Sequence, residues 1–316
     1  MKKTDKQNEK VKAETVETAV KPKTEPKIEQ AVVGERVQKL LAHAGLGSRR
    51  EIEGWIREGL IRVNGKEVGL GDRIFPEDEV RVRGRPVNLA RKLLAPTRVI
   101  IYNKPAGQVV TRKDPEGRET IFKHLPKLAA GRWIAVGRLD INTLGLMILT
   151  TNGELANRLM HPSQEVDREY GVRILGEVSD ETIMTLKKGV ELEDGFAKFT
   201  DIVAEEGEGA NRWYKVVIME GRNRIVRRLW ESQGLTVSRL QRVRHGPIFL
   251  PKGLRTGRHY EMNDGEIKSL FEYANMEPEK GDRGESHRKE VSRVVRKGRG
   301  EKRSDRRKET RPGRRR

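Results

Sequence analysis

The sequence contains no cysteine, which excludes disulfide bonds, thiolate zinc sites, iron–sulfur clusters and a cysteine nucleophile. It has no apolar run near the roughly 18 residues that a membrane-spanning helix needs. The opening residues, MKKTDKQNEK, lack the apolar core of a secretory signal. Phosphate-loop and convincing dinucleotide glycine motifs are missing, and the six histidines are too far apart along the chain for a metal cluster. We therefore expect a cytoplasmic protein that works without a metal or a nucleotide cofactor.

What the sequence has in excess is positive charge. Its 316 residues include 66 Lys and Arg against 47 Asp and Glu, a formal net charge of +19. A balance this basic indicates a polyanionic partner, either nucleic acid or an acidic membrane surface. The membrane surface is the weaker alternative, because no amphipathic apolar face accompanies the charge. The length exceeds that of a single hydrophobic core, so two domains with additional tails are expected.

Both ends of the chain have the composition of disordered segments. Residues 1–34 are rich in Lys, Glu, Thr and Pro and contain no aromatic residue. Residues 277–316 contain 17 Lys and Arg against eight acidic residues, a net charge of +9. We interpret them as a disordered leader and a disordered basic tail that tethers the protein to a polyanion, although a merely solubilising tail has the same composition. The chemistry is expected between these two segments.

Residues 35–84 have the pattern of a small domain with two helices and a β-hairpin. Apolar residues at helical spacing predict a first helix over 37–44. Ser48 and Glu51 have the spacing of a capping box that starts a second helix. An Asn-Gly pair at 64–65, between two short apolar runs, predicts a tight hairpin turn.

The stretch RVQKLLAHAGLGSRREIEGWIREGLIRVNGKEV, residues 36–68, resembles the S4 RNA-binding domain. The resemblance implies RNA as the partner and a supporting role for this block. Arg49 and Arg50, at the start of the second helix, are candidate RNA contacts, although an ordinary solvated helix face has the same composition. Residues 85–97 are predicted to be a linker to the next domain.

Residues 98–276 have the pattern of a larger mixed domain. Its central stretch, GRLDINTLGLMILTTNGEL, places Asp140 in a glycine-containing loop between two predicted strands. By itself such an Asp could simply organise its loop through an Asx turn. Tyr170 shares the strand parity of Val172 and Ile174, which predicts an inward-facing side chain and is compatible with plain core packing.

Arginine is concentrated in residues 222–244, which contain seven arginines and one acidic residue. Arginine forks are suited to bidentate contacts with phosphate groups. The stretch therefore predicts a basic floor beneath an RNA strand. It includes a helix with an apolar stripe formed by Ile225, Val226, Leu229 and Trp230.

Four ordered motifs resemble those of the RNA pseudouridine synthases that modify small-subunit and large-subunit ribosomal RNA. They are YNKPAG at 102–107, GRLDINTLGLMILTTNGEL at 137–155, REYGVRI at 168–174 and EGRNRIVRRLW at 220–230. Together with the S4 stretch, the resemblance covers residues 35 to about 260. The sequence around the last two motifs is most similar to that of the members that act on the large subunit.

The resemblance implies an isomerisation of uridine to pseudouridine that requires no cofactor. A uridine in a folded RNA helix must be flipped out before it can react. By resemblance Asp140 is the nucleophile, Arg138 helps to displace the target base, Tyr170 stacks on it, and Arg227 pairs with the nucleophile. The further candidate RNA contacts are Lys104, Arg222, Arg224 and Arg228.

The sequence departs from the family pattern at three positions. Leu144 stands where the family usually has Ser, Asn152 replaces an Asp, and Ile225 replaces a Glu or Gln. None of these changes removes Asp140 or Tyr170, so activity is still expected.

We therefore expect an α+β protein in which a small S4 domain precedes a synthase domain with a mixed, mainly antiparallel sheet flanked by helices. The expected substrate is ribosomal RNA, in the large subunit or an assembly intermediate of it, and the expected state is a monomer. Three alternatives remain at this point: a non-catalytic S4-type assembly factor that binds ribosomal RNA, a pseudouridine synthase for 16S ribosomal RNA, and an S4-bearing RNA methyltransferase.

Overall fold

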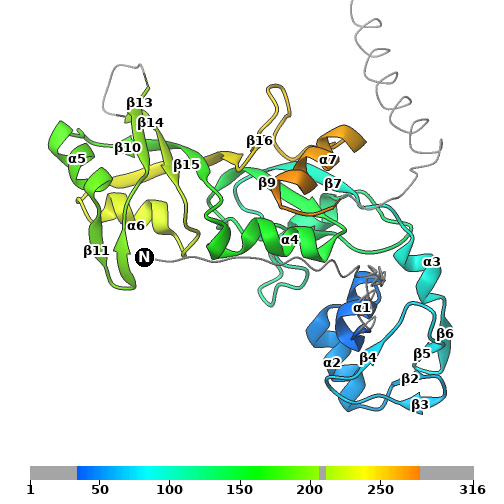
Figure 1. The fold of residues 1–316 in the computed structure, drawn as a ribbon. Coiled ribbons are helices and arrows are strands. Elements are labelled where there is room, and N and C mark those ends of the chain that lie inside the picture. Colours follow the sequence, from blue (N-terminus) through cyan, green and yellow to red (C-terminus); the bar gives the residue numbers. More distant parts are fainter. Residues whose placement is uncertain (1–33, 206–210, 278–316) are drawn as a thin grey trace, which may run out of the picture. The chain divides into compact units, whose positions relative to one another are not determined.

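The computed structural model describes residues 34–205 and 211–277 (Figure 1). Apart from Gly34 and Glu277, the predicted leader and the predicted basic tail lie outside the described residues. Within the described ranges, none of the helices combines the length and the apolar character needed to cross a bilayer.

The first domain contains two helices and short antiparallel strands around one small core. Strands β2, β3, β5 and β6 form a sheet in the order β3-β2-β5-β6, and β1 pairs with β4. The predicted capping box of α2 is confirmed, because the Ser48 hydroxyl accepts from the Glu51 amide at 3.1 Å and the Glu51 carboxylate accepts from the Ser48 amide. The elements are β1 (Glu35–Arg36), α1 (Val37–His43), α2 (Arg49–Arg57), β2 (Ile61–Val63), β3 (Lys66–Glu67), β4 (Arg73–Ile74), β5 (Val80–Val82), β6 (Arg85–Val87) and α3 (Leu89–Leu93).

The predicted linker over 85–97 is shorter in the structure. Residues 85–87 form β6, which pairs antiparallel with β5 at the edge of the four-stranded sheet. Pro86 is tolerated there because an edge strand can leave one side of its backbone unpaired. Leu89 is buried among the apolar side chains of the first domain. The first nine residues of this stretch, 85–93, thus belong to the first domain by pairing and packing.

The second domain is built on a nine-stranded sheet with the order β13-β14-β10-β15-β9-β7-β17, extended by β8 on β9 and β16 on β15. Within the described residues, every pair of this sheet is antiparallel except β9 with β15, so the expected mixed, mainly antiparallel sheet is confirmed. The strands of this sheet are β7 (Val99–Lys104), β8 (Ile134–Ala135), β9 (Leu144–Thr150), β10 (Arg168–Leu175), β13 (Asp201–Ala204), β14 (Asn211–Ile218), β15 (Thr236–His245), β16 (Ile248–Phe249) and β17 (His259–Glu261). A separate hairpin consists of β11 (Val190–Leu192) and β12 (Gly195–Ala197). The helices are η1 (Ile121–His124), α4 (Gly153–Met160), η2 (Pro162–Gln164), α5 (Asp180–Lys188), α6 (Ile225–Glu231) and α7 (Asp264–Tyr273).

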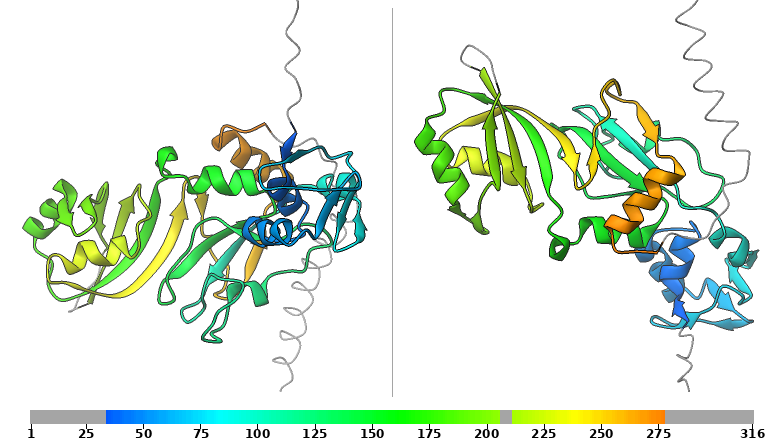
Figure 2. Two further views of the ribbon diagram at one scale, coloured as in Figure 1. Left: turned by 90° about the horizontal axis from the view of Figure 1, so that it is seen from below. Right: turned by 45° about the horizontal axis from the view of Figure 1, so that its top comes forward.

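Two apolar clusters hold this domain together. One joins α4 and α7 to a face of β7 and β9, and the other joins α6 to the inner faces of β10, β14 and β15. Figures 1 and 2 show α6 near one end of the sheet and α7 near the other. Strand β7 is buried on both faces, since Val99 and Ile101 belong to the first cluster whereas Ile100 and Tyr102 belong to the second. The parallel pair β9–β15 connects the two ends.

Candidate active site

Asp140 lies in the loop between β8 and β9, on the wall of a cleft of about 1100 Å³. Buried Leu139 anchors the loop, and the Thr143 amide closes its turn by donating to the Asp140 main-chain carbonyl at 3.0 Å. The turn is thus closed through the main chain, and the half-buried carboxylate accepts no hydrogen bond from any residue within the described ranges. The Asp140 carboxylate is free to meet a ligand.

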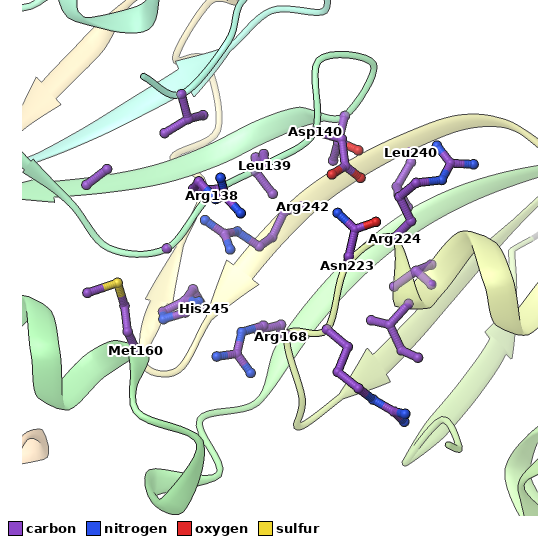
Figure 3. A pocket seen from close by; sticks show the side chains of 18 of the residues that line it. Arg138, Leu139, Asp140, Met160, Arg168, Asn223, Arg224, Leu240, Arg242 and His245 are labelled. Carbon is purple, nitrogen blue, oxygen red and sulfur yellow. The ribbon is translucent and has the colours of Figure 1, made fainter. Parts of the chain in front are cut away.

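The cleft brings together several of the predicted site residues from separate elements. Arg138 and Asp140 come from the loop before β9, Tyr170 from β10, and Arg222 and Arg224 from the segment before α6. Figure 3 shows the side chains of Arg138, Asp140 and Arg224 around the same open space. The Tyr170 side chain is mostly buried in the apolar core and also lines the cleft, so its position is compatible with core packing and with the predicted stacking on a base.

Arg227 lies beneath the Asp140 loop and is 8% exposed. Its two terminal nitrogens donate to the main-chain carbonyls of Val237 at 2.9 Å and Asn142 at 3.2 Å. Burial lowers the pKa of the Arg227 guanidinium, the charge of Arg224 adds to this, and the charge of Asp140 opposes it. Arg227 therefore supplies positive charge below Asp140 without a direct ion pair.

Lys104 is completely buried and three main-chain carbonyls occupy its ammonium, so the prediction that it contacts RNA directly is wrong. Its ammonium donates to the carbonyls of Pro105 at 2.9 Å, Ile141 at 3.2 Å and Thr143 at 2.9 Å. Two of these carbonyls belong to the loop that carries Asp140. Burial lowers the pKa of Lys104 to about 8, and the charge of Asp140 opposes this shift. Lys104 positions the loop from inside.

Arg222 and Arg228 are held by the hairpin of β11 and β12. Both guanidiniums contact the Asp194 carboxylate, Arg222 at 2.9 Å and Arg228 through two bonds of 2.8 Å. Arg222 also donates to the carbonyls of Gly195 and Phe196. Their main role in the structure is to fasten this hairpin to the start of α6, which differs from the free phosphate contacts that we predicted.

The remaining arginines of the 222–244 stretch point in different directions, so they do not form one continuous basic floor. Arg224 lines the cleft and contacts Glu231 at 3.1 Å. Arg239 is exposed and lies opposite Arg173 on the neighbouring strand. Arg244 forms ion pairs with two acidic residues of β10 and the preceding turn, whereas Arg242 is buried in the cleft. Cross-strand geometry separates residues that are close in sequence.

Three residues that line the cleft had not been singled out from the sequence: Arg168, Arg242 and His245. Nor had Gly145, which pairs with Arg242 across β9 and β15. Gly145 has φ +100, and a Cβ at this position would lie 2.3 Å from the Arg242 carbonyl oxygen. Only glycine permits β9 to approach β15 this closely. A sequence signal was available for Arg168, which shares the strand parity of Tyr170 and therefore faces the same side.

The three departures from the family pattern are accommodated. Asn152 caps α4 by accepting from the amides of Glu154 and Leu155, both at 2.9 Å, as an aspartate would. Ile225 is buried in the apolar cluster beneath the cleft. Leu144 is half-buried at the start of β9, opposite Gln241.

The other predicted RNA contacts, Arg49 and Arg50, are exposed on the first turn of α2 in the first domain. No group of three or more His, Asp or Glu side chains arranged for a metal ion occurs among the described residues.

Comparison with known proteins gives consistent matches to both domains. A family model described as RNA pseudouridylate synthase matches residues 98–232, and a model of the S4 domain matches residues 35–80. A crystal structure described as a pseudouridylate synthase aligns with a TM-score of 0.52 and 26% identity, covering 75% of this chain and 100% of that chain.

Two curated relatives are named ribosomal large subunit pseudouridine synthase B. The protein from Pseudomonas aeruginosa is 58% identical over 247 residues, which cover 78% of this chain and 64% of the relative. The protein from Haemophilus influenzae is 53% identical over 265 residues, which cover 82% of this chain and 74% of the relative. The match thus spans less than two thirds of the Pseudomonas protein's own length.

Proposed function

Because the chain belongs to the RNA pseudouridylate synthase family, we propose that it isomerises uridine to pseudouridine in large-subunit ribosomal RNA. The names of the two relatives support the large subunit as the substrate. The observation that carries the proposal is the Asp140 carboxylate, which faces a cleft and has no hydrogen-bond partner among the described residues. A carboxylate left free in this way is available as a nucleophile.

In this proposal Asp140 attacks the flipped nucleoside as an ionised carboxylate. The N1–C1′ bond breaks, the uracil rotates, a C5–C1′ bond forms, and the bond between Asp140 and the nucleoside breaks to regenerate the carboxylate. The proton leaves C5 and N1 gains one, so the reaction is balanced without a redox partner. The positive charges of Arg227 and Lys104 interact with the negative charge of Asp140. Neither charge is neutralised by an ion pair within the described part of the chain, so both act on the nucleophile.

Tyr170 and Arg138 are proposed to hold the flipped base. Tyr170 lies at the cleft wall in β10, where its ring can stack on a pyrimidine. Arg138 is exposed, two residues before Asp140, and can occupy the space that the base leaves in the RNA stack. Unstacking a base costs roughly a few kcal/mol, and each of these two contacts offsets part of that cost.

The remaining expectations belong to the same proposal. Exposed Arg49 and Arg50 on the S4 domain, together with the excess charge of residues 277–316, would bind RNA backbone away from the reacting base. We also retain a monomeric, cytoplasmic protein that acts on large-subunit RNA or an assembly intermediate.

The test is isomerisation of large-subunit and small-subunit RNA transcripts, in separate reactions, by the purified protein. Pseudouridines are mapped as carbodiimide-resistant stops of reverse transcriptase. We expect one or more new stops with the wild-type protein and none with Asp140→Asn. Asp201→Asn, the same chemical change at an exposed carboxylate paired with Lys187, is the matched control and should retain activity. RNA binding without any new stop would instead support the assembly-factor alternative, and stops only in small-subunit RNA would support the 16S alternative.

A further inference from the structure

Four side chains form a compact block on the floor of the cleft. Strands β10 and β15 are antiparallel neighbours, with Arg168 opposite His245 and Tyr170 opposite Arg242. Arg168 and Tyr170 are two residues apart and therefore face the same side of β10. All four residues line the cleft, and Figure 3 shows Arg168, Arg242 and His245 together. Two guanidiniums thus flank the tyrosine that we propose to stack on the target base.

Each of the two arginines is anchored by the main chain and has no acidic partner in the described residues. Arg168 donates to the carbonyls of Val166 at 2.8 Å and Met219 at 2.9 Å. Arg242 donates to the Leu146 carbonyl at 2.8 Å. Neither guanidinium forms an ion pair within 34–205 or 211–277, although they are only 8% and 2% exposed.

The acidic residues near Arg168 are already engaged. Asp167 and Glu220 act on the Arg168 charge, yet Asp167 pairs with Arg244 and Glu220 pairs with Arg222. Burying a charge without a counter-charge is costly, and the cost remains unless a ligand supplies the opposite sign. The cleft therefore holds two preorganised cations that lack an anion.

His245 does not add a third positive charge to the block. Its Nε2 contacts the Leu159 carbonyl at 3.1 Å, which assigns the hydrogen to Nε2. Burial lowers the pKa of His245 well below its ordinary value, and the charges of Arg242 and Arg168 lower it further. The neutral imidazole adds no charge of its own, so the positive charge of this block comes from the two guanidiniums.

We propose that Arg168 and Arg242 bind the RNA phosphodiester next to the reacting uridine and hold it while the base lies on Tyr170. This inference rests on the proposed function. Opposite residues on paired strands are roughly 5 Å apart and same-face residues on one strand roughly 7 Å apart, so the arginines lie one side chain away from the stacked base. Arginine forks on one phosphate would fix the nucleotide's backbone during rotation of the uracil.

The experiment combines a change in the RNA with a change in the protein. The RNA is a short large-subunit stem-loop that contains a uridine which the protein isomerises. Two versions are made, each with one neutral methylphosphonate, at the linkage before or after that uridine. The protein variants are Arg168→Gln and Arg242→Gln. The matched control is Arg239→Gln, which removes an exposed arginine of β15 that does not line the cleft. Single-turnover rate, RNA affinity and melting temperature are measured for each pair.

We expect one of the two methylphosphonates to reduce the wild-type single-turnover rate roughly tenfold to a hundredfold, the range for losing a charge-assisted hydrogen bond. The Gln variants should show a similar loss on natural RNA and less than about a twofold further loss on that methylphosphonate RNA, because the contact is already gone. Arg239→Gln should retain the full methylphosphonate effect.

Two results would overturn the inference. The first is a wild-type protein that is indifferent to both methylphosphonates, a result that does not depend on whether any variant folds. The second is that the loss of rate caused by an arginine substitution and the loss caused by the methylphosphonate multiply when the two are combined. Arg168 and Arg242 would then have a purely structural role. A wild-type protein that binds the RNA but does not isomerise it would count against the proposed function alone. In that case the effects of the methylphosphonates and of the arginine substitutions are compared on RNA affinity in place of the single-turnover rate.

Discussion

The close contact between β9 and β15 makes Gly145→Ala a sharp test of how the cleft is assembled. The added Cβ would lie 2.3 Å from the Arg242 carbonyl oxygen and 2.8 Å from the Gln241 Cγ, at a backbone φ of +100. The carbonyl belongs to a strand of the central sheet and cannot rotate away as a flexible side chain could. The two strands must separate.

The expected cost has two parts. Placing an L-residue in a left-handed conformation costs about 1–2 kcal/mol, and forcing extra atoms into a packed contact costs about 1–3 kcal/mol. The sum is roughly 2–5 kcal/mol, which for a domain of this size lowers the melting temperature by roughly 4–20 °C. A displacement of about 1 Å at the cleft floor can reduce the rate of the chemical step about a hundredfold.

Gly234→Ala is the matched control. Gly234 has φ +71, and a Cβ there would meet nothing within 4 Å, so only the conformational cost applies. Thermal unfolding and single-turnover isomerisation are measured for both variants. Equal melting temperatures for Gly145→Ala and Gly234→Ala, or full activity of Gly145→Ala, would refute the argument that this contact positions Arg242.

Three further predictions follow from buried or paired charges. Because burial lowers the pKa of Lys104 to about 8, the rate of isomerisation should fall as the pH rises through about 8, and the destabilisation of the fold by the buried ammonium should shrink between pH 8 and 10.5. Lys104→Met should abolish the fall in rate near pH 8. If the fall persists in this variant, Lys104 is not its source. The hydrogen bond from Arg228 lowers the pKa of Asp194, so the stabilisation from this pair is present above the ordinary pKa of an Asp and is lost as the pH falls through the lowered pKa. Asp194→Asn should therefore lower the melting temperature more at pH 7 than at a pH below the ordinary pKa of an Asp, and an equal difference at both pH values would contradict this. Arg227→Gln should reduce the single-turnover rate by roughly a hundredfold or more, with little change in the RNA affinity measured by filter binding, because the Arg227 side chain is buried below Asp140. Equal losses of rate and of affinity would make Arg227 an RNA contact.

The local elements of the fold could be predicted from the sequence because their signals lie within a few residues of one another. The capping box of α2, the Asn-Gly hairpin turn and the apolar stripe of α6 all formed where the patterns indicated. The turn residues have φ +49 at Asn64 and +81 at Gly65, the left-handed conformations that a two-residue hairpin requires. Such features depend on backbone conformation and on the nearest turn.

The ordered motifs also indicated which residues meet at the cleft, including Asp140, Arg138 and Tyr170. Their catalytic roles remain predictions until the Asp140→Asn experiment is performed. The sequence could not distinguish arginines that face the cleft from arginines that fasten the fold. All of them have the same side chain, and their composition alone predicted one basic surface.

Tertiary contacts made that distinction. Arg222 and Arg228 are engaged by Asp194, which lies 28 and 34 residues earlier, and Lys104 is held by a carbonyl 39 residues later. Whether a charge is paired, buried or open to a ligand depends on neighbours that are distant along the chain and on the face of the strand that carries it. The sequence by itself determined the local elements and the chemistry available in the second domain, whereas only the packing of β9, β10 and β15 decided which positive charges reach the cleft.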